Sequence, residues 1–237
     1  MIDPKGRVVL VSGANRGIGC AIAKCLHGKG YTVSAGARNV TALRQSLAYL
    51  GKERLLLSKY DAADRQTQDS WVAQTLERFG RIDALVNNAG TGNTFRIDVG
   101  DESELDDLWS INVKGPLFLT RACLPSLKAS RQGRIVNIGS LSGKRVRNDN
   151  AAYNLSKFAV MALTHGTRRL GWEHGVRATA LCPSFVATDL TAGVTKITRE
   201  EMIDPTDLAE MAAMVIALPN SAAVAELLVN CRLEDTL

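Results

Sequence analysis

The chain has 237 residues, 46% of them hydrophobic and 22% charged, the balance of a globular protein long enough for a full α/β domain. The net charge is +5, but the chain has no long Lys/Arg block. Its five cysteines form no CxxC pair, and none of its three histidines is at metal-ligand spacing from a second ligand residue. These features argue against nucleic-acid binding, a disulfide framework and a metal site. No apolar run is long enough for a membrane span and none of signal-peptide type precedes the first expected strand, so we expect a cytoplasmic protein.

Short β-branched runs alternate with longer amphipathic segments along the whole chain. Strands are expected at 8–12, 31–37, 54–60, 82–86, 134–138, 176–181 and 224–229. Helices are expected at 18–26, 41–49, 64–79, 102–130, 151–174 and 205–218. This alternation predicts repeated βαβ units in one α/β domain over residues 1–237, a doubly wound parallel sheet with helices on both faces. In such a sheet, ligands bind outside the carboxyl ends of the strands.

A glycine cluster follows the first expected strand and opens the first helix. It reads Gly13-Ala14-Asn15-Arg16-Gly17-Ile18-Gly19. Glycines at this place let backbone N–H groups approach a pyrophosphate, whose charge the helix N-terminus favours. The alternative is a glycine-rich turn with no ligand.

The end of the second expected strand has no acidic residue. An Asp or Glu there would hold the ribose hydroxyls of NAD, but the chain has Arg38 and Asn39. Arg38 and Arg16 are suited to clamp the 2′-phosphate of NADP(H), which NAD lacks. We therefore expect a preference for NADP(H); if both arginines are only surface charges, NAD(H) is the cofactor.

Tyr153 and Lys157 are four residues apart on an expected helix and so share one face. A nearby cation favours the phenolate form of a tyrosine, which lets the side chain exchange a proton with a substrate oxygen. A buried tyrosine beside a surface lysine has the same spacing. Ser140 directly follows an expected strand, thirteen residues before Tyr153, and adds a hydrogen-bond donor.

Taken in chain order, these segments resemble the short-chain dehydrogenase/reductase family. The resemblance rests on the glycine cluster preceded by Ser12 in place of the usual Thr, Asn87-Asn88-Ala89-Gly90, Asn112, Ser140, Tyr153 with Lys157, and Pro183 to Thr188. It implies a three-layer Rossmann-type fold and an oxidoreductase that transfers a hydride between NADP(H) and a carbonyl or secondary alcohol carbon.

The resemblance also implies individual roles. Tyr153 is the acid/base, Lys157 its electrostatic partner, Ser140 the group that with Tyr153 binds the substrate oxygen, and Asn112 the holder of a water linked to Lys157. The implied cofactor-binding residues are Gly13, Asn15, Arg16, Gly17, Ile18, Gly19, Arg38, Asp61, Ala62, Asn88, Ala89, Gly90, Tyr153, Lys157, Pro183, Ser184, Val186 and Thr188. The resemblance implies a homodimer or homotetramer built on the two long helices. It also implies a small-molecule carbonyl or alcohol substrate.

Some segments depart from the family pattern or leave alternatives open. Ser184 replaces the usual Gly, so the backbone there must accept a Cβ. Residues 189–204 correspond to the variable substrate lid. In the polar loop 144–150, one hypothesis is that Arg145 or Arg147 contacts an anionic or polyhydroxylated substrate; the alternative is that both are solvated charges. An NAD-preferring alcohol dehydrogenase, a non-catalytic nucleotide sensor, and an isomerase or dehydratase remain alternatives.

Overall fold

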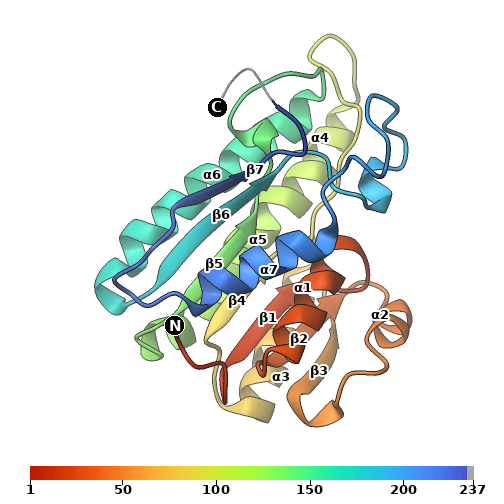
Figure 1. Ribbon diagram of the computed structural model, residues 1–237. Helices are drawn as coiled ribbons and strands as arrows, with labels where there is room; N and C mark the ends of the chain where they lie inside the picture. The colour runs from red at the N-terminus through yellow and green to blue at the C-terminus, as the bar shows by residue number, and fades with distance from the viewer. Residues whose placement is uncertain (234–237) are drawn as a thin grey trace.

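A seven-stranded parallel sheet forms the centre of the protein in a computed structural model that describes residues 1–233 (Figure 1). The strand order is β3-β2-β1-β4-β5-β6-β7. The strands are β1 (Val8–Ser12), β2 (Thr32–Ala37), β3 (Leu55–Lys59), β4 (Ala84–Asn87), β5 (Arg134–Ile138), β6 (Arg177–Pro183) and β7 (Glu226–Val229). The chain reverses its direction of winding between β1 and β4, and at such a point a doubly wound sheet opens a crevice.

Helices cover both faces of this sheet and give three layers, as expected. The helices are α1 (Gly17–Gly28), α2 (Val40–Ser46), α3 (Arg65–Phe79), α4 (Glu102–Trp109), α5 (Gly115–Ala129), α6 (Ala151–Gly171) and α7 (Pro205–Ala217). Helices α1, α2 and α7 pack on one face, and α3, α5 and α6 on the other. The predicted α/β doubly wound fold is confirmed.

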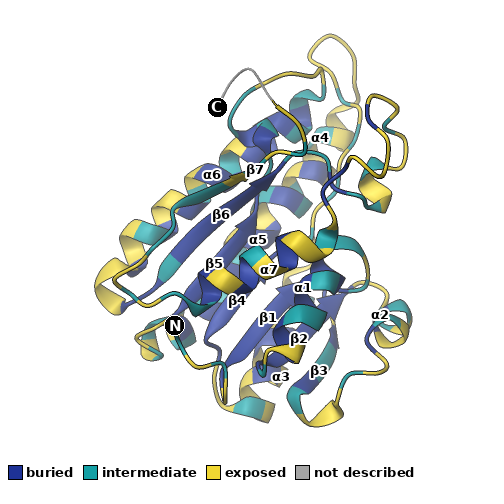
Figure 2. Cartoon of the chain, in the orientation of Figure 1, coloured by how far each residue is buried: buried dark blue, intermediate teal, exposed yellow. Residues whose placement is uncertain are grey.

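Residues of β1 show why the strands are continuous apolar runs. Val9 and Val11 face the α1/α7 side of the core, whereas Val8 and Leu10 face the α3/α5 side. All four are at most 2% exposed, because neighbouring strands and both helix layers cover them. Figure 2 shows the buried central strands between helices whose outer faces are exposed. A strand buried on both faces has no polar side to interrupt the apolar run.

The segment expected as one helix at 102–130 is helical from Glu102 to Ala129, but it is not α-helical throughout. It consists of α4, a π-helical turn at Ser110–Lys114, and α5, which follow one another without a break. The wide turn brings Gly115 against Ala62, where a Cβ on the glycine would lie only 2.8 Å from the Ala62 Cβ. A tertiary contact therefore sets the helix register here, and the local periodicity does not contain that information.

Candidate active site

The glycine turn after β1 has the close approaches that a nucleotide cradle needs. Gly13 and Gly17 have positive φ angles of 67° and 54°, which residues with a Cβ rarely adopt. A Cβ on Gly13 would lie 2.9 Å from Asn88 Nδ2, and one on Gly17 would lie 3.2 Å from Thr188 Cγ2. A Cβ on Gly19 would overlap Asn88 Nδ2 and the Gly13 carbonyl oxygen. The bare backbone is therefore required at all three positions.

Ser12 joins the carboxyl ends of β1 and β4. Its Oγ accepts hydrogen bonds from the N–H groups of Asn88 and Ala89, both at 3.0 Å, and donates to the Val86 carbonyl at 3.3 Å. In return, Asn88 Nδ2 donates to the carbonyls of Ser12 at 2.9 Å and Gly13 at 3.2 Å. The serine thus supplies the side-chain hydrogen bond expected of the usual threonine, and fixes the floor of the crevice.

The first turn of α1 presents unused hydrogen-bond donors to this crevice. Within residues 1–233, the N–H groups of Gly17, Ile18 and Gly19 have no acceptor. No acidic side chain occupies the first turn, and the Arg16 side chain does not cap it. Free N–H groups at a helix N-terminus suit an anion such as a pyrophosphate, so the residues present fit a dinucleotide.

The two arginines expected to read a 2′-phosphate lie on the exposed surface near this turn. Arg16 Nη1 forms an ion pair with Asp189 Oδ2 at 2.9 Å, and both side chains are largely exposed. Arg38 is exposed and has no hydrogen bond or ion pair with any other described residue. Asn39 caps α2 by accepting the Ala42 N–H at 2.9 Å. Because neither Arg38 nor Asn39 is acidic, no carboxylate follows the end of β2 directly.

Asp61 and Ala62 follow β3 on the same side of the sheet. Asp61 Oδ1 accepts the Ala63 N–H at 3.0 Å, and its own N–H donates to Thr67 Oγ1 at 2.9 Å. Ala62 is buried against Gly115. These hydrogen bonds hold Asp61 in a tight turn directly after β3.

Lys157 and Tyr153 lie together on α6. Lys157 is only 8% exposed, and its Nζ donates to the Ile138 carbonyl at 2.9 Å. The same nitrogen lies 5.5 Å from the centre of the Tyr153 ring. Ser140, just after β5, accepts the Ser142 N–H at 3.1 Å, while its hydroxyl proton has no acceptor among the described residues. The arrangement places a buried cation beside the half-buried Tyr153 ring, and the Ser140 hydroxyl follows the strand whose last carbonyl holds that cation.

Asn112 sits in the π-helical turn and is 3% exposed. Its Nδ2 donates to the Thr91 carbonyl at 2.8 Å and to Ser156 Oγ at 3.1 Å, and its Oδ1 accepts the Thr91 N–H at 2.9 Å. Ser156 Oγ then donates to the Tyr153 carbonyl at 2.8 Å. Asn112 and Lys157 also line one small cavity. Ser156 is not among the residues predicted from the sequence, where its place between Tyr153 and Lys157 is the only signal.

The segment after β6 is held by the end of the chain. Ser184 N–H donates to the Val229 carbonyl at 2.8 Å, and Ser184 Oγ accepts the Cys231 N–H at 3.0 Å. Among the described residues other than glycine, only Arg131 has a positive φ, so the Ser184 backbone accepts a Cβ as required. Pro183 and Val186 are buried, and Val186 pairs with Ile203.

Gly92 and Leu190, which the sequence did not single out, lie close to each other near Tyr153. A Cβ on Gly92 would lie 3.6 Å from Leu190 Cδ1 and 3.7 Å from Tyr153 Cδ2. Leu190 is nevertheless 60% exposed. Gly92 therefore lies between the lid and the Tyr153 ring, and nothing local in the sequence identifies this contact.

The polar loop after Ser140 is tied to the last strand. Lys144 Nζ lies 2.6 Å from Glu226 Oε2, and Glu226 Oε1 lies 2.7 Å from His165 Nε2. The Lys144 hydrogen bond holds the pKa of Glu226 below its usual range. Arg145 and Arg147 already interact within the chain.

The cysteine in β6 is deeply buried. Cys182 is fully buried, and burial raises its pKa to about 11, so the thiol stays protonated at neutral pH. In the described part of the chain, no three His, Cys, Asp or Glu residues are grouped so as to hold a metal ion. Within the same range, no helix has the length and apolar character needed to cross a membrane.

Sequence comparison gives matches over most of the chain. A family model described as short chain dehydrogenase matches residues 7–198. Agropine synthesis reductase of Rhizobium rhizogenes is 42% identical over 229 residues, which are 96% of this chain and 53% of that protein. An uncharacterized oxidoreductase of Staphylococcus saprophyticus is 32% identical over 233 residues, 97% of this chain and 99% of its own. The chain thus spans about half of the Rhizobium reductase.

Solved structures with the same fold have been determined with nicotinamide cofactors. A 3-ketoacyl-(acyl-carrier-protein) reductase from Brucella melitensis complexed with NADH has a TM-score of 0.89 and 28% identity, covering 96% of this chain and 98% of that one. A metagenomic short-chain oxidoreductase in complex with NADP has a TM-score of 0.83 and 31% identity, covering 98% and 100%. Because both cofactor types occur, these structures support a nicotinamide dinucleotide without selecting one.

Proposed function

The chain belongs to the short-chain dehydrogenase family, and from that premise we propose that it transfers a hydride between NADP(H) and a carbonyl or secondary alcohol carbon. The observation that carries this proposal is the grouping of Lys157, Tyr153 and Ser140 at the same edge of the sheet as the glycine cradle. A dinucleotide on the cradle and a carbonyl carbon beside the phenol are what such a reaction requires.

The nicotinamide, when bound, supplies or accepts the hydride. In the reducing direction, the Ser140 hydroxyl donates a hydrogen bond to the substrate oxygen, and Tyr153 transfers its proton to that oxygen. The buried Lys157 ammonium stabilises the resulting phenolate, and the Ile138 carbonyl holds the ammonium in place. Asn112 borders the cavity behind Lys157, through which a proton returns to the phenolate. In the oxidising direction, the same groups act in reverse.

The cofactor roles follow the position of each residue around the crevice. We assign the glycine turn to the pyrophosphate, Asp61 and Ala62 to the adenine, and Arg16 with Arg38 to the 2′-phosphate. The remaining assignments to the ribose and nicotinamide side are Asn88, Ala89, Gly90, Tyr153, Lys157, Pro183, Ser184, Val186 and Thr188. The missing acid at the end of β2 supports NADP(H), because no carboxylate there competes for or repels the phosphate.

Replacing the phenol tests the catalytic assignment. Tyr153→Phe removes the transferable proton and leaves the ring, so we expect NADPH binding to persist and NADPH-dependent reduction of any carbonyl active with the wild type to fall by at least about 100-fold. Tyr49→Phe is the matched control, because Tyr49 is 69% exposed and is not among the residues assigned to the site. Undiminished turnover by Tyr153→Phe contradicts the proposal.

Fluorescence titration with NADPH and NADH tests the cofactor assignment. We expect NADPH to bind at least about tenfold more tightly, and Arg38→Gln to reduce that preference, since a guanidinium–phosphate contact is charge-assisted. Equal affinities favour the NAD-preferring alternative. Binding of NADPH without turnover of any carbonyl or alcohol favours a nucleotide sensor.

We also propose a homodimer or homotetramer in the cytoplasm. Exposed apolar side chains on α5 and α6, including Leu117, Leu155 and Phe158, support association through these helices. All five cysteines are free thiols, which supports a reducing compartment. Light scattering of the eluting protein measures its mass, and a monomer contradicts the first part.

A further inference from the structure

Arg16 makes one contact that links two distant parts of the chain. It precedes the first turn of α1, beside the unused N–H groups of the cradle, yet its guanidinium is paired with Asp189 at 2.9 Å. Asp189 is the first residue of the lid, 173 residues later. We call this ion pair the Arg16–Asp189 latch.

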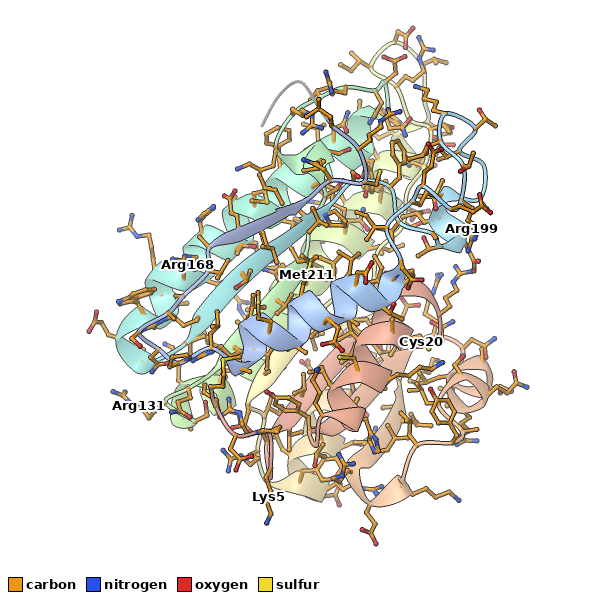
Figure 3. The ribbon with its side chains drawn as sticks, viewed as in Figure 1. Lys5, Cys20, Arg131, Arg168, Arg199 and Met211 are labelled. Atoms are coloured by element: carbon orange, nitrogen blue, oxygen red, sulfur yellow. The ribbon has the colours of Figure 1, made fainter. Side chains whose placement is uncertain are left out.

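The start of the lid rests on the glycine turn by more than this ion pair. Thr188 packs closely on Gly17, and Arg199 donates to the carbonyls of Ala187 at 3.1 Å and Thr188 at 3.5 Å. Figure 3 shows Arg199 on the lid segment, near the end of α1 that carries Cys20. Because these contacts do not involve Arg16, opening the latch leaves the base of the lid folded.

One guanidinium cannot make its best contacts with both a lid carboxylate and a cofactor phosphate. A phosphate monoester carries close to two negative charges at neutral pH and accepts the planar fork of an arginine in a two-pronged contact. A carboxylate carries one charge, and an ion pair as exposed as this one contributes little free energy. The phosphate therefore displaces the carboxylate when both are present.

We propose that Asp189 competes with the 2′-phosphate of NADP(H) for Arg16, so that loading this cofactor opens the latch. The proposal rests on the proposed NADP(H) preference and adds a residue that limits it. NADH has no 2′-phosphate and leaves the latch closed. Asp189 thus weakens NADP(H) binding selectively and couples the choice of cofactor to the freedom of the lid.

Adenosine 2′,5′-bisphosphate and AMP are the probes for the binding test, because they differ by the 2′-phosphate and carry no nicotinamide. In Asp189→Asn, we expect the bisphosphate to bind about two- to fivefold more tightly, the range that an exposed ion pair allows, and AMP to be unchanged. Glu200→Gln is the control, since it removes an exposed lid charge that has no partner in the described chain. Equal tightening of both nucleotides, or an equal effect in the control, overturns the proposal.

A double-mutant cycle separates the latch from the cofactor preference. Arg16→Gln should weaken the bisphosphate but not AMP, and in that background Asp189→Asn should have no further effect. If Arg16→Gln weakens only the bisphosphate but Asp189→Asn does not tighten it, the latch is wrong and the preference stands. If Arg16→Gln changes the affinity for neither nucleotide, Arg16 does not bind the 2′-phosphate, and both its assigned cofactor role and the latch are wrong.

Hydrogen exchange of peptides covering residues 189–202 gives a readout independent of affinity. In the wild type, saturation with the bisphosphate should speed exchange of this segment relative to saturation with AMP. In Asp189→Asn, the two nucleotides should give the same faster exchange. Slower or equal exchange in the wild type with the bisphosphate overturns the coupling.

Discussion

Removing the Ser12 hydroxyl tests the link between the two halves of the crevice. Ser12 is 1% exposed, and Ser12→Ala leaves the N–H groups of Asn88 and Ala89 without their acceptor. A buried N–H group without an acceptor lowers the free energy of unfolding by about 1–3 kcal/mol. Loss of the longer hydrogen bond from Ser12 to the Val86 carbonyl lowers it by less. Since the crevice side admits some water, we expect the free energy of unfolding to fall by about 2–4 kcal/mol.

Urea denaturation followed by circular dichroism measures this loss directly. For a chain of this size, it corresponds to a fall in Tm of about 5–15 °C. The NADPH dissociation constant should rise in the same variant, because Asn88 also packs against Gly13 and Gly19. Ser12→Thr keeps the hydroxyl and should stay within about 1.5 kcal/mol of the wild type. A loss below about 1 kcal/mol for Ser12→Ala would refute the reasoning, since the two N–H groups would then have found other partners.

Three other substitutions have defined outcomes. Gly19→Ala should abolish NADPH binding in a fluorescence titration, whereas Gly166→Ala, with open space around the new methyl group, should bind normally and raise stability by up to about 1 kcal/mol. The pKa of Glu226 is lowered from 4.5 by Lys144, so Glu226 stabilises the fold above that pH and loses its effect as the pH falls. Acid titration of Glu226→Gln by circular dichroism should therefore show a shallower loss of stability below about pH 5; an unchanged slope rules this out. Asp83→Ala leaves the buried Arg7 guanidinium and the Val8 N–H without this carboxylate, and removes the partner of the half-exposed Arg81. It should lower the free energy of unfolding by about 3–5 kcal/mol in urea; a loss under about 1 kcal/mol contradicts it.

Strand positions could be predicted from the sequence where burial on both faces produces an uninterrupted apolar run. The strands at 8–12 and 134–138 have the predicted bounds, since glycine-containing turns or polar residues end each run. The end of the long helix before Gly175 was also predicted, although its last turn is a 3-10 helix, Trp172–His174. Gly175 adopts φ 75°, which explains why the helix stops there.

Parts of the site that depend on distant contacts could not be predicted in this way. That Ser12 supplies a side-chain hydrogen bond could be predicted from the resemblance to a known family, but its partners Asn88, Ala89 and Val86 could not. The pairing of Arg16 with Asp189 could not, because no local pattern relates residues so far apart and each is an ordinary surface charge alone. The meeting of Gly92 with Leu190 has the same origin, since both lie in irregular segments whose course only the folded chain defines.

The π-helical turn at Ser110–Lys114 accommodates one extra residue while keeping the two flanking helices in register. An α-helix rotates by about 100° per residue and a π-helix by less, so the five residues here cover nearly the rotation that four would cover in an α-helix. Deleting one residue from the turn would therefore leave Leu119 and Cys123 of α5 facing the core, but would remove the wide turn that holds Asn112 against Thr91. A deletion within α5 itself would instead turn the buried face of that helix away from the core.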